Sequence, residues 1–430
     1  MNFSRLCVLG MGYIGLPTAS TFATHGLKVI GVDVNDRVVQ ILQNGEIHIQ
    51  EPGLKTLVQA AFHSGNLQVK PQPESADAFF ICVPTPVQPD KSADLSYVLS
   101  AAESIVPHLR PGNLVVLEST SPPGTTVEVV RPALERSGLR AGPDFHLAYS
   151  PERVLPGQIL KEMIENARVI GGIDIASAQA GKDLYGIFVQ GEIVLTDATT
   201  AEMVKLMENA FRDVNIALAN EFLRLGERFG VDIWEAIRLA NRHPRVRILQ
   251  PGPGVGGHCV SVDPWFLVEA APDLTSLIRQ SRMVNDDQPA YVLGVVRKEL
   301  GDLAGATIST LGLTYKPDID DVRESPALRI IELLRKAGAK VRAYDPWAPA
   351  DVLEGMRASD VEQCAKGADC LLLLVAHETF KSLDPRLLRP LVNRPLAVDC
   401  QHVWHRSQWE AAGFSLRSLG IPKPQEASVR

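Results

Sequence analysis

A glycine-rich turn near the N-terminus constrains the fold of this chain more than any other feature. The turn reads GMGYIG from Gly10, follows the apolar run LCVL and leads into a helix-compatible stretch through Ala23. In a dinucleotide-binding turn the first glycine (Gly10) allows the tight bend, and the second (Gly12) admits a pyrophosphate close to the backbone. The third, Gly15, lets the helix pack closely, with its N-terminus facing the anion. The pattern predicts a strand–turn–helix unit that binds a dinucleotide.

A carboxylate stands where such a unit would hold the ribose of the cofactor. A second apolar strand is predicted from Lys28 to Val32 and is followed directly by Asp33. A carboxylate at this position accepts a hydrogen bond from a ribose 2′-hydroxyl and repels a 2′-phosphate. We therefore predict NAD rather than NADP, against the alternative that Asp33 is a solvated carboxylate at a strand end.

Hydroxyl side chains follow two later strands of the same predicted sheet. Strand patterns at Ala78 to Val83, Leu114 to Glu118 and Phe145 to Tyr149 alternate with helix-like stretches, which indicates an open, mostly parallel sheet. Thr85 and Thr120 lie just past two of these strands, at the edge where such sheets place their ligands. Either threonine alone is better explained as a turn former, so the cofactor contact depends on both.

The length and patterning predict an α/β protein with two Rossmann-like domains, mostly parallel sheets and a central long helix between them. At 430 residues the chain has room for about three structural units. We expect domains at residues 1–199, 200–300 and 301–430. The middle one contains a long helix over Ala201 to Phe229, and a Pro/Gly-rich loop interrupts its helices at residues 251–257. Later strands are predicted at residues 307–311, 340–344, 370–375 and 396–398. The polar tail, residues 422–430, is expected to fray.

Composition excludes several classes of protein. The net charge of −7 lacks the Lys/Arg excess of nucleic-acid binders, and the longest apolar run, residues 370–376, is too short to cross a membrane. No secretion signal is predicted, so we expect a cytoplasmic protein. The six cysteines are scattered without CxxC pairs or Cys/His ligand spacing, which predicts no metal site and no disulfide framework.

One cysteine has unusual neighbours. The stretch GGHC ends at Cys259 on the glycine-rich loop, and Asp263 follows four residues later. A loop thiol beside backbone N–H groups can ionise and attack a carbonyl carbon. The alternative is a small buried apolar residue, which is our interpretation of the other five cysteines.

The predicted long helix has a polar face. Lys205, Asn209 and Arg212 follow at steps of four and three, and Asn220 lies eight residues further on. A polar stripe of this kind usually faces solvent, but the asparagine could equally point into a cleft.

Longer motifs make the chain resemble a known family, over nearly its whole length and in order. They read GMGYIGLPTA, VPTP, ESTSPPGTT, SPERVLPG, AEMVKLMENAFRDVNIALANE, GPGVGGHCVSVDPWF and LTYKPDIDDVRESPA. The chain thereby resembles the UDP-glucose/GDP-mannose dehydrogenase family. Within it, SPERVLPG with NARVIGG, NRHPRVRILQPGPGVGGHC and DVNIALANE are more similar to the branch that oxidises UDP-N-acetyl-D-mannosamine than to the UDP-glucose branch.

The resemblance implies a four-electron oxidation of the sugar C6 alcohol to a carboxylate, with two NAD⁺ used in sequence, and a uronic acid product for polysaccharide biosynthesis. Cys259 would capture the intermediate aldehyde as a thiohemiacetal and later hold a thioester, which water hydrolyses. Lys205 and Asn209 would bracket the developing oxyanion, with Lys205 also in proton transfer, while Asp263 and Glu152 orient or activate water.

The same resemblance implies two sets of binding residues. The cofactor set adds Tyr13, Ile14 and Arg37 to Gly10, Gly12, Gly15, Asp33, Thr85 and Thr120. The UDP-sugar set consists of Arg153, Val154, Lys205, Asn209, Arg212, His243, Arg245, Gly256, Tyr315, Lys316 and Arg323. Arg245 is expected to reach a neighbouring subunit's site, which implies a homodimer or a higher homo-oligomer. The domain at 200–300 would then carry dimerisation and the catalytic loop, and the domain at 301–430 would bind the UDP-sugar.

Alternatives and departures remain open. A sister enzyme for UDP-N-acetylglucosamine or UDP-glucose shares the cofactor and the thiol, and sequence spacing does not distinguish the sugars. A two-electron hydroxyacid dehydrogenase with a structural Cys259, or a dinucleotide-sensing protein without catalysis, are more distant alternatives. Gln401 replaces a Lys or Arg usual in the family, which puts a nucleotide or cofactor contact there in doubt. Residues 406–430 extend past the last matching motif and are assigned nothing.

Overall fold

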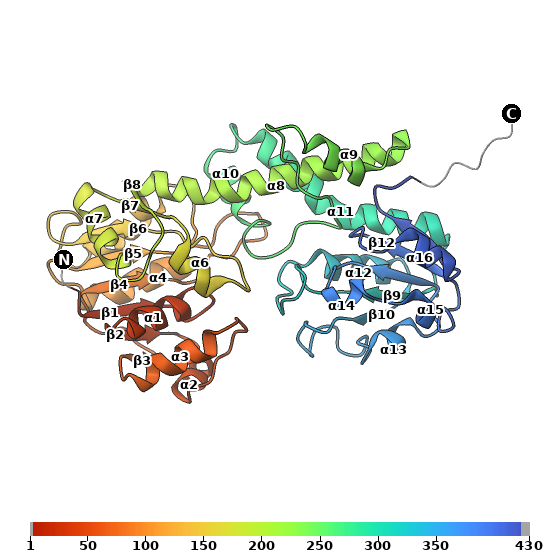
Figure 1. The fold of residues 1–430 in the computed structure, drawn as a ribbon. Coiled ribbons are helices and arrows are strands. Elements are labelled where there is room, and N and C mark those ends of the chain that lie inside the picture. The colour runs from red at the N-terminus through yellow and green to blue at the C-terminus, as the bar shows by residue number, and fades with distance from the viewer. Residues whose placement is uncertain (1–2, 423–430) are drawn as a thin grey trace. The chain divides into compact units, whose positions relative to one another are not determined.

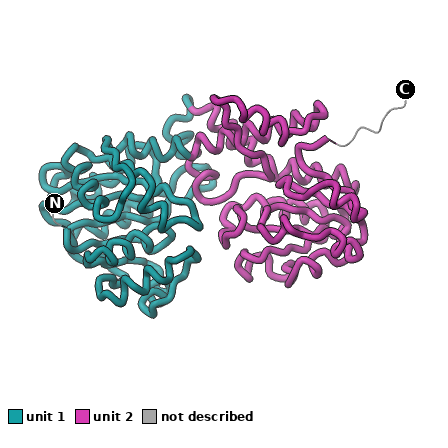
Figure 2. Tube along the Cα trace, in the orientation of Figure 1, with its two compact units in different colours: residues 1–208, 265–274 teal, residues 209–264, 275–430 magenta. Residues whose placement is uncertain are grey.

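The computed structural model describes residues 3–422, which form the two compact units coloured in Figure 2. The N-terminal unit comprises residues 1–208 and 265–274, and the C-terminal unit comprises residues 209–264 and 275–430. Helix α8 (Ala198–Phe229) begins in the first unit and continues in the second. Within the described residues no helix is both long and apolar enough to cross a membrane.

The N-terminal unit is built on an eight-stranded sheet. Its strand order is β3-β2-β1-β4-β5-β6-β7-β8, and every neighbouring pair is parallel except β6 with β7. From β1 the strand order runs through β2 to β3 on one side of the sheet and through β4 to β8 on the other. The direction of the strand order therefore reverses between β1 and β4, and a ligand crevice is expected at the carboxyl ends of these two strands. The strands are β1 (Arg5–Leu9), β2 (Lys28–Val32), β3 (Leu67–Lys70), β4 (Ala78–Ile81), β5 (Leu114–Leu117), β6 (His146–Tyr149), β7 (Arg168–Gly172) and β8 (Ile193–Asp197).

Helices bury both faces of this sheet. Leu6 and Val8 of β1 lie in one apolar cluster with residues of α1, α3 and α7, whereas Cys7 and Leu9 lie in another with residues of α4, α5 and the start of α8. Alternate side chains thus enter opposite cores, which explains why the strand is apolar throughout. The helices are α1 (Gly15–Thr24), α2 (Asp36–Gln43), α3 (Leu54–His63), α4 (Ser96–Ile105), α5 (Arg131–Glu135), α6 (Ile159–Glu165) and α7 (Ile175–Tyr185).

The C-terminal unit contains a second, five-stranded sheet, which is parallel throughout in the order β10-β9-β11-β12-β13. Its strands are β9 (Thr307–Leu311), β10 (Lys340–Tyr344), β11 (Cys370–Leu373), β12 (Leu396–Asp399) and β13 (Ser415–Ser418). Around it lie α12 (Pro326–Lys336), α13 (Val361–Ala365), α14 (Glu378–Lys381), α15 (Pro385–Leu388) and α16 (Arg406–Ala411) (Figure 1). The two parallel sheets confirm the predicted fold class.

Three further helices complete the C-terminal unit: the longer part of α8, α9 (Ile233–Ala240) and α11 (Ser276–Leu300). Buried polar groups join α8 to α11, since Arg282 forms an ion pair with Asp213 at 2.5 Å and Asn220 donates to Asn285 at 3.0 Å. Asn220 also accepts from Gly252 N at 2.9 Å, which anchors the Pro/Gly-rich loop to the helix. That loop has no regular structure, as predicted.

The structure confirms the predicted strands and the long helix, and it adds elements that the sequence interpretation omitted. The long helix begins at Ala198, three residues before the predicted start. Strands β3, β7, β8 and β13 were not predicted, because they are short, end in glycines or carry polar residues. The segment from Arg406, which was assigned nothing, forms α16 and β13 at the edge of the second sheet. Most of the tail predicted to fray, residues 423–430, lies outside the described residues.

Candidate active site

The glycine turn joins β1 to α1 in a conformation that explains two of its glycines. Gly10 has a φ of 92°, and a Cβ there would lie 2.5 Å from the Cys82 carbonyl oxygen. A Cβ on Gly15 would lie 1.8 Å from the Gly10 oxygen, so neither position accepts a side chain. Apart from Gly12 itself and its two chain neighbours, no atom of the described residues lies within 4 Å of the Cβ position of Gly12. The backbone there is open to a close-approaching ligand, as a dinucleotide site requires.

The Asp33 carboxylate is anchored beside this turn. It accepts hydrogen bonds from Met11 N at 3.0 Å and from Asn35 N at 2.9 Å, and it is partly exposed. Asn35 caps α2 by accepting from the N–H of Arg37, whose own side chain is exposed. Tyr13 and Ile14 lie half-buried on the turn itself.

His48 lies near Asp33 and was not identified from the sequence. Burial lowers the pKa of its imidazole, while the Asp33 carboxylate acts in the opposite direction. The residue stands alone in the stretch EIHIQEPG, so no pattern marks it.

Both predicted threonines lie in loops at the carboxyl end of the first sheet. Thr85 follows β4 and Thr120 follows β5, and the Thr85 hydroxyl donates to the Thr120 carbonyl oxygen at 2.6 Å. The two loops are therefore tied together next to the strand-order reversal, although this hydroxyl hydrogen is already engaged.

A buried charge cluster lies at the same end of the sheet. Arg168 at the start of β7 forms ion pairs with Glu152 at 2.6 Å and Glu118 at 3.7 Å, and its guanidinium lies 4.3 Å from the Tyr185 ring centre. Burial raises the pKa of Glu118, and Arg168 counteracts it. Burial alone would lower the pKa of Arg168, but the Glu152 carboxylate outweighs it and the pKa is raised, so the guanidinium stays charged. The cluster orients Glu152, and sequence reasoning assigned Arg168 no role.

The segment that contains Glu152 is fixed at several points. Arg153 forms an ion pair with Glu208 at 2.8 Å and donates to the Ala167 carbonyl oxygen at 3.1 Å. Further along, the Glu51 carboxylate accepts from Gly157 N and Ile159 N, both at 2.8 Å. Val154 lies between these anchors and packs partly buried against the apolar core.

The polar face of α8 is largely buried. Asn209 is 0% exposed and Lys205 only 7%, whereas Arg212 is exposed. Asn209 donates from its amide nitrogen to the Asp263 carboxylate and accepts from Arg212 at its amide oxygen. Asn209 is thus held at both ends of its amide group.

The loop that contains Gly256, Gly257 and Cys259, called the cysteine loop below, leads directly into α10 (Asp263–Ala270). The Cys259 carbonyl oxygen accepts from Val262 N at 3.0 Å and Asp263 N at 2.8 Å, which forms a turn immediately before the helix. Cys259 is partly exposed, whereas Asp263 is 2% exposed.

The other five thiols lie in different surroundings. Burial raises the pKa of Cys7 to about 11 and that of Cys364 to about 12. Burial likewise raises the pKa of Cys82, Cys370 and Cys400. These thiols remain protonated at neutral pH. Cys7, Cys364, Cys370 and Cys400 are buried, in agreement with their interpretation as buried apolar residues, whereas Cys82 is partly exposed and its thiol donates to the Glu118 carboxylate at 3.0 Å.

The loop after β9 packs against the cysteine loop. A Cβ on Gly257 would lie 2.8 Å from Tyr315 Cε2, and one on Gly256 would lie 2.7 Å from Tyr315 Cβ. Gly257 N donates to the Arg323 carbonyl oxygen at 3.1 Å. The C-terminal unit therefore brings Gly256, Tyr315 and Arg323 to the loop of Cys259, and Lys316 follows Tyr315 in the same segment.

Two predicted residues lie elsewhere on the surface of the C-terminal unit. His243 and Arg245 are exposed in the loop after α9, where the Asn241 side chain pairs with the Ile248 backbone. The Gln401 side chain donates to the Leu374 carbonyl oxygen at 2.6 Å, so the amide that replaces the usual cation bonds the protein's own backbone.

Family models match most of the chain. They are the UDP-glucose/GDP-mannose dehydrogenase family NAD binding domain at residues 4–189, its central domain at residues 199–287 and its UDP binding domain at residues 309–406.

Known proteins similar to this chain carry related names. A UDP-N-acetyl-D-mannosamine dehydrogenase of Methanococcus maripaludis is 47% identical over 97% of each chain. An NDP-N-acetyl-D-galactosaminuronic acid dehydrogenase of Ralstonia nicotianae is 46% identical over 94% of this chain and 97% of its own. The solved structure of a UDP-D-ManNAc dehydrogenase from Pyrococcus horikoshii is 41% identical with a TM-score of 0.92, covering 97% of this chain and 99% of that one.

Proposed function

Because the chain belongs to the UDP-glucose/GDP-mannose dehydrogenase family, we propose that it oxidises C6 of UDP-N-acetyl-D-mannosamine to the carboxylate, with two NAD⁺ per sugar. The observation that carries the choice of sugar is the full-length similarity to dehydrogenases of that name, in sequence and in structure. The product, UDP-N-acetyl-D-mannosaminuronate, would serve polysaccharide biosynthesis.

The cofactor site fits NAD. The open backbone at Gly12 suits a pyrophosphate, and the anchored Asp33 carboxylate suits a ribose with a free 2′-hydroxyl. We assign cofactor contacts to Gly10, Gly12, Tyr13, Ile14, Gly15, Asp33, Arg37, Thr85 and Thr120. When bound, NAD⁺ accepts one hydride from C6 in each of the two oxidations.

Cys259 would make the second oxidation feasible. Its thiolate adds to the aldehyde carbon and forms a thiohemiacetal, whose oxidation leaves a thioester. Water then cleaves the carbon–sulfur bond, which releases the carboxylate and restores the thiol. The supporting observations are the partial exposure of Cys259 and its place on a turn before α10. Of the other cysteines only Cys82 is also partly exposed, and burial raises the pKa of its thiol, which donates to Glu118.

The polar groups of α8 and of the buried carboxylates suit the remaining steps. Lys205 and Asn209 lie one helical turn apart on α8, as a pair that stabilises an oxyanion requires. The Lys205 side chain, as the amine, would accept the hydroxyl proton, and the ammonium formed in this way would stabilise the oxyanion together with the Asn209 amide. Asp263 holds Asn209 in orientation and would orient water. The ion pair with Arg168 holds the Glu152 side chain in place, and from there it would activate water.

Cationic and aromatic side chains, together with two small or apolar residues, would hold the UDP-sugar. Cationic and aromatic groups suit a diphosphate and a uracil ring, which favours Arg153, Arg212, His243, Tyr315, Lys316 and Arg323, together with Val154 and Gly256. Arg245 would act on the site of a neighbouring subunit. The domain limits 1–199, 200–300 and 301–430 remain part of this proposal, and the three family models support them.

We further infer a homo-oligomer in the cytoplasm. Phe211, Leu218 and Leu225 follow at steps of seven on α8 and are 64%, 42% and 46% exposed, so they form an apolar stripe that a second copy would cover. All six cysteines are free thiols, which suits a reducing compartment.

The yield of NADH per limiting sugar tests the function. Purified protein is given UDP-N-acetylmannosamine, UDP-N-acetylglucosamine or UDP-glucose with excess NAD⁺. Two NADH from the first sugar alone are expected. Two from another sugar would move the substrate to a sister enzyme, and one or none would contradict the thioester route.

A further inference from the structure

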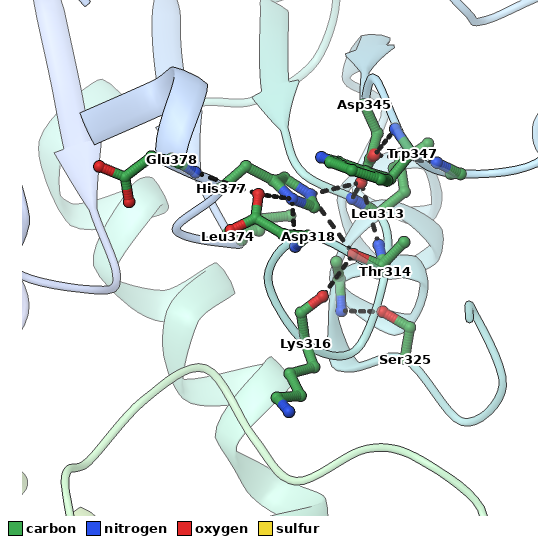
Figure 3. A network of polar contacts seen from close by, with 12 residues as sticks. Leu313, Thr314, Lys316, Asp318, Ser325, Asp345, Trp347, Leu374, His377 and Glu378 are labelled. Carbon is green, nitrogen blue, oxygen red and sulfur yellow. Dashed lines mark hydrogen bonds and ion pairs between the residues drawn. The ribbon is translucent and has the colours of Figure 1, made fainter. Parts of the chain in front are cut away.

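A buried carboxylate–imidazole pair lies under the loop that carries Tyr315 and Lys316. Asp345 follows β10 and is 1% exposed, and His377 lies just before α14 and is 0% exposed. His377 Nε2 lies 2.9 Å from Asp345 Oδ2 (Figure 3).

The hydrogen bonds determine which ring nitrogen carries the hydrogen. The backbone N–H of Asp318 points to His377 Nδ1 at 2.9 Å, so Nδ1 accepts. Nε2 therefore carries the ring hydrogen and donates it to Asp345. One ring thus joins the end of β10 to the middle of the loop after β9.

The Asp345 carboxylate is fully engaged within the protein. Oδ2 also accepts from Leu313 N at 2.6 Å and Thr314 N at 3.1 Å, and Oδ1 accepts from Trp347 N at 2.7 Å and Ala348 N at 3.0 Å. Asp345 follows the second strand of its βαβ unit, as Asp33 does in the first sheet, but it lacks the free oxygen positions that a ribose would need. Its role is to hold the loop.

These contacts clamp the loop on both sides of Tyr315 and Lys316. Asp345 holds residues 313 and 314, His377 holds Asp318, and the Thr314 hydroxyl donates to the Lys316 carbonyl oxygen at 2.9 Å. Beyond Asp318 the chain continues to Arg323, whose carbonyl oxygen accepts from Gly257 N beside the cysteine loop.

We propose that His377 and Asp345 are positioning residues for UDP-sugar recognition, which act by clamping the segment that carries Tyr315, Lys316 and Arg323. This inference rests on the proposed function, because it requires these residues to contact the substrate. The clamp lies in the C-terminal unit, whereas the glycine turn of the cofactor lies in the N-terminal unit. Loss of the clamp is therefore expected to weaken UDP-sugar binding and not NAD⁺ binding.

Three substitutions of His377 test the clamp. His377→Phe keeps an aromatic ring and its edge contact with Phe380 but removes the polar contacts with Asp345, Asp318 and Thr314. His377→Asn keeps an acceptor near Nδ1 for Asp318 N, and His377→Gln keeps a donor near Nε2 for Asp345. We expect the Phe variant to raise the KM for the UDP-sugar about tenfold, with less effect on kcat and none on the KM for NAD⁺. The Asn and Gln variants should each restore part of the loss.

Asp369→Asn is the matched control. Asp369 accepts from Thr307 N at 2.8 Å at the amino-terminal ends of β9 and β11, whereas the clamp lies at the carboxyl ends, so Asp369→Asn should lower Tm without raising the KM for the UDP-sugar. A wild-type sugar KM in His377→Phe would overturn the clamp while leaving the proposed function intact. If His377→Phe does not fold, wild-type sugar KM values in both the Asn and the Gln variants would overturn it equally. A wild-type enzyme that reduces no NAD⁺ with any UDP-sugar would overturn both.

Discussion

At the scale of single residues, the six cysteines separate by environment. Cys7, Cys364, Cys370 and Cys400 are buried, and Cys82 is partly exposed but its thiol donates to the Glu118 carboxylate. Burial raises the pKa of all five thiols. Cys259 is partly exposed on a turn before α10. A thiol must be reachable and able to ionise to attack an aldehyde carbon. Cys82 and Cys259 both meet the first requirement, but burial raises the pKa of the Cys82 thiol and so opposes its ionisation.

Cys259→Ser should therefore remove carboxylate formation. A serine hydroxyl has a far higher pKa than a thiol and is therefore a weaker nucleophile at neutral pH. Its alkoxide is also a poorer leaving group from an ester than a thiolate is from a thioester. Four-electron turnover should therefore fall by about a thousandfold or more. The measurement is NADH yield together with the mass of the sugar product. Cys364→Ser, a buried cysteine in the same unit, is the control, and normal turnover by the Cys259 variant would refute covalent catalysis.

Asp33 should control the choice between the two nicotinamide cofactors. Asp33→Ala removes the acceptor for the ribose hydroxyl and the charge that repels a 2′-phosphate, so the KM for NAD⁺ should rise and the preference over NADP⁺ narrow by about tenfold or more. Steady-state kinetics with both cofactors measure this. Asp197→Ala removes a carboxylate at the end of β8 in the same sheet and should leave the preference unchanged. Unaltered cofactor kinetics in Asp33→Ala would exclude the ribose contact.

Asp345 should stabilise the fold in a pH-dependent way. Burial would raise its pKa, but hydrogen bonds from His377 and the backbone lower it from 3.8 to about 2. A carboxylate whose pKa is lower in the folded than in the unfolded protein stabilises the fold at pH values above the unfolded pKa. For Asp345 this contribution is about 2 kcal/mol, and it is lost as the pH falls through the pKa of the folded protein. The gap in unfolding free energy between wild type and Asp345→Asn should be full above pH 5 and shrink between pH 4 and about 2. Urea unfolding across this range measures it, and a gap independent of pH would contradict the assignment.

At the scale of elements, the conformation of the cysteine loop depends on its packing against the loop after β9. Gly257 has a φ of 83°, and an added Cβ would meet the Tyr315 ring. Gly257→Ala should therefore cost about 1–2 kcal/mol of backbone strain and also raise the KM for the UDP-sugar, because Tyr315 must move. Gly230→Ala is the matched control, since Gly230 has a φ of 74° and, apart from its chain neighbours, no atom among residues 3–422 lies within 4 Å of its Cβ position. Equal sugar KM values in the two variants would show that the contact with Tyr315 does not matter.

The elements that could be predicted from the sequence are those whose local residue pattern alone identifies them as a strand or a helix. β1, β9 and β10 are apolar or alternating runs bounded by turn residues, and their predicted limits agree with the structure to within a residue. β13 reads SLRS and depends on pairing with β12 at the sheet edge, which no local pattern reveals. Strand pairing partners supply the missing stabilisation, so such strands are visible only in the folded chain.

The residues of the candidate site also divide into those that a local motif identifies and those that only contacts in the folded chain identify. Gly10, Asp33 and Cys259 belong to motifs whose neighbours identify them. Arg168 and His377 are single residues whose contacts, to Glu152 and to Asp345, come from distant segments. Long-range pairs of this kind become recognisable only when the sheets are formed.

At the scale of the whole molecule, the proposed homo-oligomer would allow Arg245, which is exposed in the loop after α9, to serve the site of a partner chain. Arg245→Ala alone should raise the KM for the UDP-sugar, but this does not tell whether the arginine acts within its own chain. In the proposed oligomer, the exposed apolar stripe of Phe211, Leu218 and Leu225 would be the surface of association. Shared sites can be detected by mixing two defective chains.

Co-expression of Arg245→Ala with Cys259→Ala should restore activity if Arg245 acts across the interface. In a mixed dimer, the chain that keeps Cys259 receives an intact Arg245 from its partner, and the other site lacks both groups. Random pairing makes half of the dimers mixed with one good site each, so about a quarter of wild-type activity is expected at limiting sugar. Each variant expressed alone is the control, and sedimentation gives the oligomeric state. If Arg245 served its own chain, every site in the mixture would lack one group, and the co-expressed protein would be no more active than the average of the two variants.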